Sequence, residues 1–156
     1  MEILDITGPD EALLALNNAH AAELSFMTAA RFARILRASF TARRIGTVAM
    51  LLAFDQDADY DGENFLWFRA RYPRFVYVDR VVVAAQARGL GLARKLYEEV
   101  FALAAQAGHG RILCEVNAEP PNPASDAFHA ALGFTQVGGA TLSGGEKRVR
   151  YFCKEF

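Results

Sequence analysis

The spacing of apolar residues changes along the chain between a period near 3.6 and a period of two, which predicts alternating helices and strands. Residues 2–6 (EILDI) predict a strand, and a helix opens at Pro9 and Asp10. A break near residues 23–26 precedes a second helix, whose apolar stripe is Phe32, Ile35 and Leu36. Residues 40–54 (FTARRIGTVAMLLAF) predict two strands that fold back near residues 45–47, and residues 55–74 predict a long loop with an aromatic turn.

The second half of the chain continues the alternation. Residues 75–85 (FVYVDRVVVAA) are rich in β-branched and aromatic side chains, which favours a strand. Apolar positions at helical spacing over residues 90–107 predict a helix, and a strand (residues 111–117), a proline-rich loop (119–123) and a short helix (124–134) follow. Two last strands are joined at Gly144-Gly145, a two-residue hairpin signal. Without a repeat or a linker, the pattern predicts one α/β domain with a mixed sheet over residues 1–156.

Composition and charge narrow the classes of partner. The chain has 156 residues, is 53% hydrophobic and carries a net charge of −1, so it is long enough for a core and no charge excess favours nucleic acid. The basic side chains near the C-terminus are predicted to be a solvated strand face: Lys147, Arg148, Arg150 and Lys154. The acidic start of the chain argues against a signal peptide, and the longest uncharged apolar stretch (45–54) is half of a membrane span. Cys114 and Cys153 lack metal-type spacing, so we expect reduced thiols in a cytoplasmic protein with no membrane partner.

The stretch QARGLGLARK (86–95) places two glycines where a backbone could close around phosphate. A dinucleotide fingerprint would need a third glycine, but that position is Arg94. The triphosphate P-loop pattern does not occur in the sequence. The stretch LSGGE (142–146) resembles the signature of transporter ATPases, which requires a P-loop, so a hairpin turn explains it better.

The acidic stretch DADYDGENFLWF (57–68) begins like a calcium loop, with aspartates at the first, third and fifth places and Gly62 at the sixth. Its twelfth place should be a glutamate and is Phe68, so we predict no metal site. The same acids, with Asp55 and Glu63, could instead attract a cationic substrate or form a solvated loop. The sequence leaves these alternatives open.

The order of strand, Gln-x-Arg-Gly-x-Gly and helix around residues 75–107 resembles the acyl-CoA-binding motif of the GNAT superfamily of acetyltransferases. Independently of the resemblance, glycines expose backbone N–H groups at a helix N-terminus, where the dipole favours an anion, and Arg88 adds a cation. The resemblance implies a GNAT fold, with a mixed, mostly antiparallel sheet of about seven strands flanked by about four helices. It implies acetyl-CoA as co-substrate, with contacts at Val81, Val82, Val83, Gln86, Ala87, Arg88, Gly89, Leu90, Gly91, Leu92, Ala93, Asn117, Asn122, Ser125 and Phe128.

Residues 114–134 (CEVNAEPPNPASDAFHAALGF) resemble the second half of a GNAT core. They are similar to the N-terminal-peptide acetyltransferases of bacterial ribosomal proteins, whose strand Glu and loop Asn correspond to Glu115 and Asn122. The helix Tyr of those enzymes is replaced by His129. The stretches NNAHAAELS, NFLWF and YVDRVVV also resemble a bacterial GNAT subgroup known only as predicted acetyltransferases, which implies a reaction class but no acceptor.

Attack of an amine on a thioester needs a base and a proton for the departing thiolate. Glu115 is the first candidate base, on the strand face opposite Cys114 and Val116, and Cys114 is expected to be core rather than an acetyl carrier. Asp79 is the rival base, expected on a face with Val81 and Val83, or else a structural partner of Arg80. His129 either protonates the thiolate or only packs. The backbone amides of Val81 and Val83 are implied by the resemblance to polarise the thioester carbonyl.

The acceptor is expected to enter beside the first two helices, the 55–72 segment and the final hairpin. Trp67, with Phe65 and Phe68, either forms an aromatic wall there or belongs to the core. The predicted function is acetyl transfer from acetyl-CoA to a primary amine, of a small molecule or a peptide N-terminus, by direct attack in a ternary complex. The alternative is an acyl-CoA-binding or regulatory protein without turnover, and a homodimer is left open.

Overall fold

The chain folds into seven strands, five α-helices and one 3₁₀ helix, counted over residues 1–21, 24–119, 121–142, 144–145 and 147–156, which this computed structural model describes. In chain order the elements are β1 (Ile3–Asp5), α1 (Glu11–Ala19), α2 (Ala29–Ala38), β2 (Thr41–Ile45), β3 (Ala49–Asp55), α3 (Glu63–Arg69), β4 (Val76–Val83), η1 (Ala85–Ala87), α4 (Leu92–Gln106), β5 (Arg111–Asn117), α5 (Pro123–Ala131), β6 (Thr135–Thr141) and β7 (Arg148–Glu155). Within these ranges, none of the helices has the length and apolar character needed to cross a membrane.

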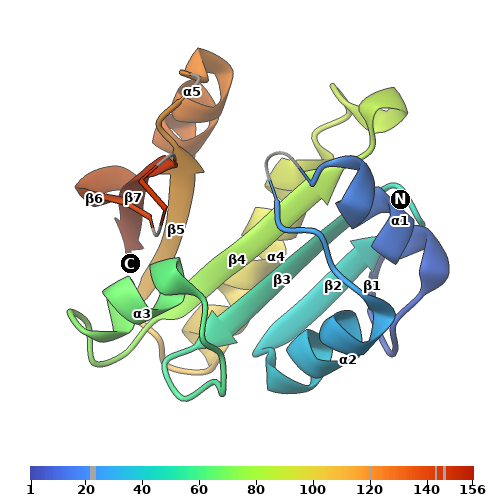
Figure 1. The fold of residues 1–156 in the computed structure, drawn as a ribbon, viewed down its shortest axis with the longest axis horizontal. Coiled ribbons are helices and arrows are strands. Elements are labelled where there is room, and N and C mark those ends of the chain that lie inside the picture. Colours follow the sequence, from blue (N-terminus) through green and yellow to red (C-terminus); the bar gives the residue numbers. More distant parts are fainter. Residues whose placement is uncertain (22–23, 120, 143, 146) are drawn as a thin grey trace.

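All seven strands join one sheet in the order β1-β2-β3-β4-β5-β7-β6. Neighbouring strands are antiparallel except β4 and β5, which are parallel and pair at two positions, Val76 with Ile112 and Tyr77 with Leu113. Beyond these two pairs β4 and β5 diverge toward their carboxyl ends (Figure 1). The expected fold class, a mixed and mostly antiparallel sheet of seven strands, is confirmed.

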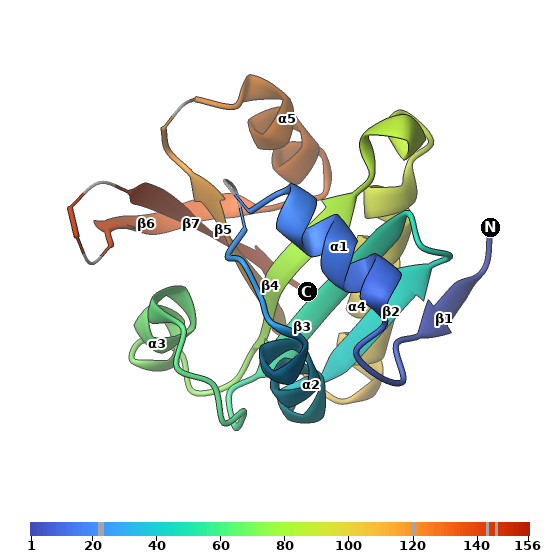
Figure 2. The same ribbon diagram turned by 45° about the vertical axis from the view of Figure 1, so that its right-hand side comes forward.

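Each face of the sheet carries its own core because side chains alternate along every strand. On β3, for example, Met50, Leu52 and Phe54 enter one core, whereas Ala49, Leu51 and Ala53 enter the other. The first core is covered by α1, α2 and α3, and the second by α4 and α5. Figure 2 shows α1 and α2 in front of the sheet and α4 behind it. The two faces therefore bring different elements to the gap between β4 and β5.

Two predicted connections differ from the structure. The segment 55–74 is not a continuous loop but contains α3, the helix added to the four that were expected. Its Phe65 and Phe68, three residues apart, are both buried, but one such pair in seven residues is too short a pattern to distinguish from a loop. The final hairpin is confirmed, but its connection is longer than two residues, since the Leu142 N–H donates to the Lys147 carbonyl (2.8 Å). Of the stretch LSGGE, Ser143 and Glu146 lie outside the described residues.

A β-bulge in the β3–β4 pairing overturns the predicted face of Asp79. The register shifts between Leu52 and Ala53, so that the partners of β4 skip Asp79. The extra residue places Asp79 on the same face as Tyr77 and Arg80, whereas Val81 packs in the opposite core. Strict alternation along the strand predicted the wrong face because a bulge is invisible to a period-two pattern.

Candidate active site

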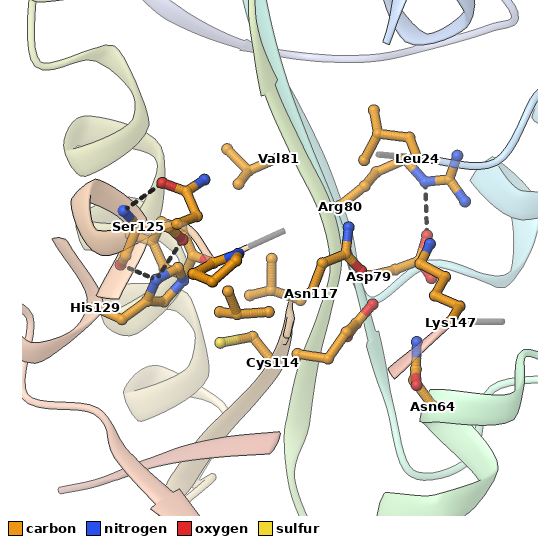
Figure 3. Close-up of a pocket in the computed structure, with 16 residues that line it drawn as sticks. Leu24, Asn64, Asp79, Arg80, Val81, Cys114, Asn117, Ser125, His129 and Lys147 are labelled. Carbon is orange, nitrogen blue, oxygen red and sulfur yellow. Dashed lines mark hydrogen bonds and ion pairs between the residues drawn. The ribbon is translucent and has the colours of Figure 1, made fainter. Parts of the chain in front are cut away.

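A cleft opens where β4 and β5 diverge, and it has two connected parts. The larger cavity, of about 330 Å³, reaches toward α5, and the smaller, of about 200 Å³, lies toward α3 and the final hairpin. Six residues line both: Leu24, Asn64, Asp79, Arg80, Glu115 and Lys147. Figure 3 shows His129 and Ser125 on one side of the cleft, and Asp79, Lys147 and Asn64 on the other.

Glu115 is partly buried on β5 and lies at the junction of the two cavities. The Tyr77 hydroxyl donates to its Oε2 atom at 2.8 Å. Burial and then the nearby charge of Asp79 raise the pKa of Glu115 to about 8, against hydrogen bonds from Tyr77 and Asn64 that lower it. A carboxyl group with such a pKa in a cleft can hold or release a proton near neutral pH, which is what a general base requires.

Asp79 is engaged on both carboxylate oxygens. The Tyr60 hydroxyl donates to Oδ1 and Arg80 Nε donates to Oδ2, each at 2.7 Å, and both side chains of the ion pair are 6% exposed. Arg80 in turn donates to the Oδ1 atom of the buried Asn17, at 2.9 Å. This geometry is that of a structural ion pair, and it leaves Glu115 as the better placed base.

His129 is buried on α5 with both ring nitrogens near partners. Its Nδ1 lies 2.7 Å from the Ser125 carbonyl, which can only accept, so Nδ1 carries the hydrogen and Nε2 is the acceptor. The Tyr97 hydroxyl lies 3.4 Å from Nε2, and burial lowers the pKa of the imidazole. A neutral imidazole of this tautomer does not offer a proton to the cleft, whereas Tyr97, which also lines the larger cavity, carries an O–H. The helical spacing of apolar residues predicted Tyr97 as a core position, so no sequence signal distinguished it from the other buried residues of α4.

Cys114 lies on the opposite face of β5 from Glu115, in the core formed with α4, as the alternation of the strand predicts. Burial, followed by the charge of Glu115, raises the pKa of its thiol well above the usual value. Because the thiolate is the nucleophilic form, this environment does not favour a covalent acetyl-cysteine route.

The backbone of β4 turns part of its hydrogen-bonding edge toward the cleft. The Ala84 N–H donates to the Val48 carbonyl beside β3 (2.7 Å). Successive N–H groups of a strand point to opposite edges, so those of Val81 and Val83 point away from β3, to the edge where β5 has diverged. The two amides are therefore available to a carbonyl oxygen.

The glycine-rich stretch 86–93 forms the entry to α4. Gly89 and Gly91 have φ of 82° and 74°, and a Cβ on either would meet no atom within 4 Å. The glycines are thus needed for their left-handed backbone and not for space. Among the residues that the structure describes, no side chain caps the first N–H groups of α4. With the exposed Arg88, which donates to His20 Nε2 at 3.3 Å, this helix start has the groups that hold a pyrophosphate.

The predicted site residues are brought together only in part. Among the described residues, the larger cavity is lined by Val81, Asn117, Asn122, Ser125 and His129, besides Asp79 and Glu115. Residues 82, 83, 86–93 and 128 line neither cavity. Asn122 also caps α5, since its Oδ1 accepts the Ser125 N–H (3.1 Å), and Phe128 packs edge-on against Tyr97.

Trp67 lies outside both cavities. Its indole stacks on Tyr151, with ring centroids 4.1 Å apart, and the Arg71 guanidinium lies 3.8 Å from its ring centroid. The aromatic groups that do face the smaller cavity are Tyr60 and Tyr77. The sequence did not identify these two tyrosines as site residues, because a pattern of apolar positions does not distinguish an aromatic residue that lines a cavity from one in the core.

Of the acidic stretch, Glu63 lines the smaller cavity, whereas Asp61 pairs with Arg31 at 3.5 Å. Phe68, at the last place of the calcium-like pattern, is buried in the core. In the part of the chain that the structure describes, no three His, Cys, Asp or Glu side chains are grouped to hold a metal ion.

Comparison with known proteins agrees with this geometry. Residues 38–134 match the model of the family described as Acetyltransferase (GNAT) family. No curated protein matches the chain by sequence.

Among solved structures, a ribosomal-protein-alanine N-acetyltransferase from Brucella melitensis superposes with a TM-score of 0.75 at 21% identity, over 100% of both chains. Naa20 from Chaetomium thermophilum, in complex with a bisubstrate analogue, gives 0.75 at 15% identity, over 100% of this chain and 87% of that one. The putative acetyltransferase yncA from Salmonella typhimurium, with acetyl-CoA, gives 0.72 at 18% identity, over 99% and 93%. At these identities the likenesses show the fold.

Proposed function

Because the chain belongs to the Acetyltransferase (GNAT) family, we propose that it transfers the acetyl group of acetyl-CoA to a primary amine by direct attack in a ternary complex. The observation that carries the proposal is Glu115, a partly buried carboxyl group with a pKa raised to about 8, at the point where the two cavities meet. One cavity then serves the donor and the other the acceptor, and the base lies between them.

The donor side uses groups that the fold leaves open. The start of α4 and Arg88 bind the pyrophosphate of acetyl-CoA, and Asn122 and Ser125 line the wall along which the rest of the donor lies. The N–H groups of Val81 and Val83 donate to the thioester oxygen, which becomes more negative as the amine attacks. These amides are held by the sheet, so they need no reorganisation during the reaction.

The acceptor side supplies the base. Glu115 takes one proton from the attacking nitrogen as the N–C bond forms and the C–S bond breaks. The departing thiolate is stabilised by a hydrogen bond from Tyr97 and receives its proton from solvent. Before the reaction His129 Nε2 accepts from the Tyr97 hydroxyl and keeps it beside the cleft, and this one hydrogen turns to the thiolate as the C–S bond breaks. In this proposal His129 is thus a positioning residue.

An α-amine fits this base better than a lysine side chain. At pH 7 an α-amine (pKa about 7.8) needs about 1 kcal/mol to lose its proton, whereas a lysine amine (about 10.4) needs about 4.6 kcal/mol. A carboxyl group with a pKa of about 8 is matched to the first and not to the second. A ribosomal-protein-alanine N-acetyltransferase shares this fold, so a peptide N-terminus is one form of the proposed acceptor, and a small amine is the other.

The test is thiol release from acetyl-CoA with a panel of α-amines, lysine-like amines and short peptides. We expect turnover with at least one α-amine, and Glu115→Gln should lower kcat/KM about 10²-fold or more at pH 7 while sparing acetyl-CoA affinity. Tight acetyl-CoA binding with no turnover on any acceptor would instead establish an acyl-CoA-binding or regulatory protein. Unchanged turnover of Glu115→Gln across pH 6–9 would remove Glu115 as the base.

We also propose a cytoplasmic location and a homodimer. Cell fractionation and light scattering of the purified chain test the two directly.

A further inference from the structure

We propose that Asn64 is a positioning residue for the Glu115 carboxylate, and that Tyr151 fixes the orientation in which Asn64 does this. The inference rests on the proposed function, in which Glu115 is the base. It assigns a role in catalysis to Asn64 of α3, which opens the NFLWF stretch, and to Tyr151 of β7, which lies in none of the stretches that carry the family resemblance.

Asn64 enters the cleft from the first turn of α3 and, like Glu115, lines both cavities (Figure 3). The Tyr151 hydroxyl donates to the Asn64 Oδ1 atom at 2.8 Å. An amide whose oxygen is engaged in this way presents its NH₂ group on the other side. That donor end faces the Glu115 side chain in the cleft that both residues line, where it lowers the pKa of the carboxyl group. The Tyr151 hydroxyl therefore sets the orientation in which the Asn64 amide faces the base.

Tyr151 cannot easily turn away. It is 1% exposed, its ring stacks on Trp67, and Phe68 meets it edge-on with ring centroids 4.9 Å apart. Gly138 pairs with Tyr151 in the sheet, and a Cβ on it would lie 2.7 Å from the edge of the Trp67 ring, so the hairpin packs closely against this stack. Trp67 is thus behind the site and supports it, although it does not line the cleft.

The consequence for Glu115 is electrostatic as well as geometric. The Tyr77 hydroxyl donates to its carboxylate and the Asn64 amide faces it, and both lower its pKa in favour of the charged form that accepts a proton, against burial and the charge of Asp79. If the amide were free to flip, its oxygen would face the carboxylate and repel it. Among the described residues, the other charged or titratable groups that face the cleft around Glu115 are Tyr60, Glu63, Asp79, Arg80, Tyr97, Cys114, His129 and Lys147.

The experiment is the pH dependence of kcat/KM for Asn64→Leu, Asn64→Asp and Tyr151→Phe. We expect the acidic limb of the profile to move up by about one pH unit in Asn64→Leu, because a donor to a charged group is lost. Asn64→Asp should move it further, since it adds a like charge, and Tyr151→Phe should move it less in the same direction. The matched control is Tyr72→Phe, which removes a phenol from the same aromatic cluster and should leave the limb in place.

A lower rate with an unmoved acidic limb in all three variants would overturn the proposal, because loss of packing alone does not shift a titration. Acetyl-CoA affinity and thermal unfolding show whether Asn64→Leu still folds. If Asn64→Leu does not fold, the pH profile of Asn64→Asp, whose side chain has nearly the same shape as asparagine, tests the proposal.

A carboxyl ¹³C NMR titration of Glu115, assigned with Glu115→Gln, separates the proposal from the proposed function. A shift of that titration in the Asn64 variants, with no turnover on any amine, would keep the positioning role and reject the reaction. An unmoved titration would reject the positioning role even in an active enzyme.

Discussion

Glu115→Gln should make the protein more stable at alkaline pH while it removes activity. The native state keeps the Glu115 proton up to a pKa of about 8, whereas the unfolded chain releases it near the ordinary value of 4.5. Between these values the native state therefore binds more protons than the unfolded state, so the free energy of unfolding falls as the pH rises. Glutamine has nearly the same shape and does not titrate, so the variant escapes this loss.

The magnitude follows from the two pKa values. Each unit of difference is about 1.36 kcal/mol, so a change from 4.5 to about 8 corresponds to about 3–5 kcal/mol once both states are ionised. This contribution is fully present below pH 4.5 and is lost by about pH 8. It is a large fraction of the stability of an ordinary domain. In the proposed function, this loss of stability is the cost of keeping the pKa of the base near that of its acceptor.

Urea unfolding of wild type and Glu115→Gln at several values between pH 5 and 9 measures the effect. We expect nearly equal free energies of unfolding at pH 5, and a variant that is more stable by about 3–5 kcal/mol at pH 9. Glu2→Gln, which removes an exposed carboxylate, corrects for the general loss of one negative charge. A difference between wild type and Glu115→Gln that stays constant over this range would refute the reasoning.

Three further predictions concern groups around the cleft. Burial lowers the pKa of His129, so the neutral imidazole contributes stability that is present above pH 6.5 and is lost as the pH falls below that value. His129→Gln should therefore reduce the drop in melting temperature between pH 7.5 and 5. Gly138→Ala places a Cβ 2.7 Å from the Trp67 ring and should cost about 1–3 kcal/mol in urea unfolding, whereas Gly8→Ala, with no atom within 4 Å, should cost much less. Asn17→Ala removes one hydrogen-bond acceptor of the buried Arg80 guanidinium and should lower the free energy of unfolding by about 2–3 kcal/mol. Equal urea unfolding midpoints for the variant and the wild type would contradict this prediction.

The elements with long and regular patterns could be predicted from the sequence. The β-branched run of β4 and the helical spacing of α4 give unambiguous periods, and the glycines between them mark the turn. The helix α3 could not be predicted in the same way, because seven residues contain fewer than two turns of evidence. Its aromatic side chains gain their helical conformation from burial against the sheet, which is a tertiary effect.

The candidate site was predictable where it depends on strand position and less so where it depends on packing. The alternation of β5 correctly separated Glu115 from Cys114, and that separation needed only the period of a strand. The face of Asp79 was predicted wrongly because one extra residue reverses the alternation. Asn64 and Tyr77 reach Glu115 from elements distant in sequence, and no local pattern contains that information.

The divergence of β4 and β5 has a consequence for how this enzyme could change. The smaller cavity is walled by Leu24, Tyr60 and Leu142, which belong to connections between elements, whereas the glycine-rich entry to α4 lies on the other side of the sheet. In the proposed function, substitutions in those connections would reshape the acceptor cavity without disturbing the glycine-rich entry to α4 that binds the donor. Variation in one set of surface segments is then enough to produce enzymes of different selectivity from a single scaffold.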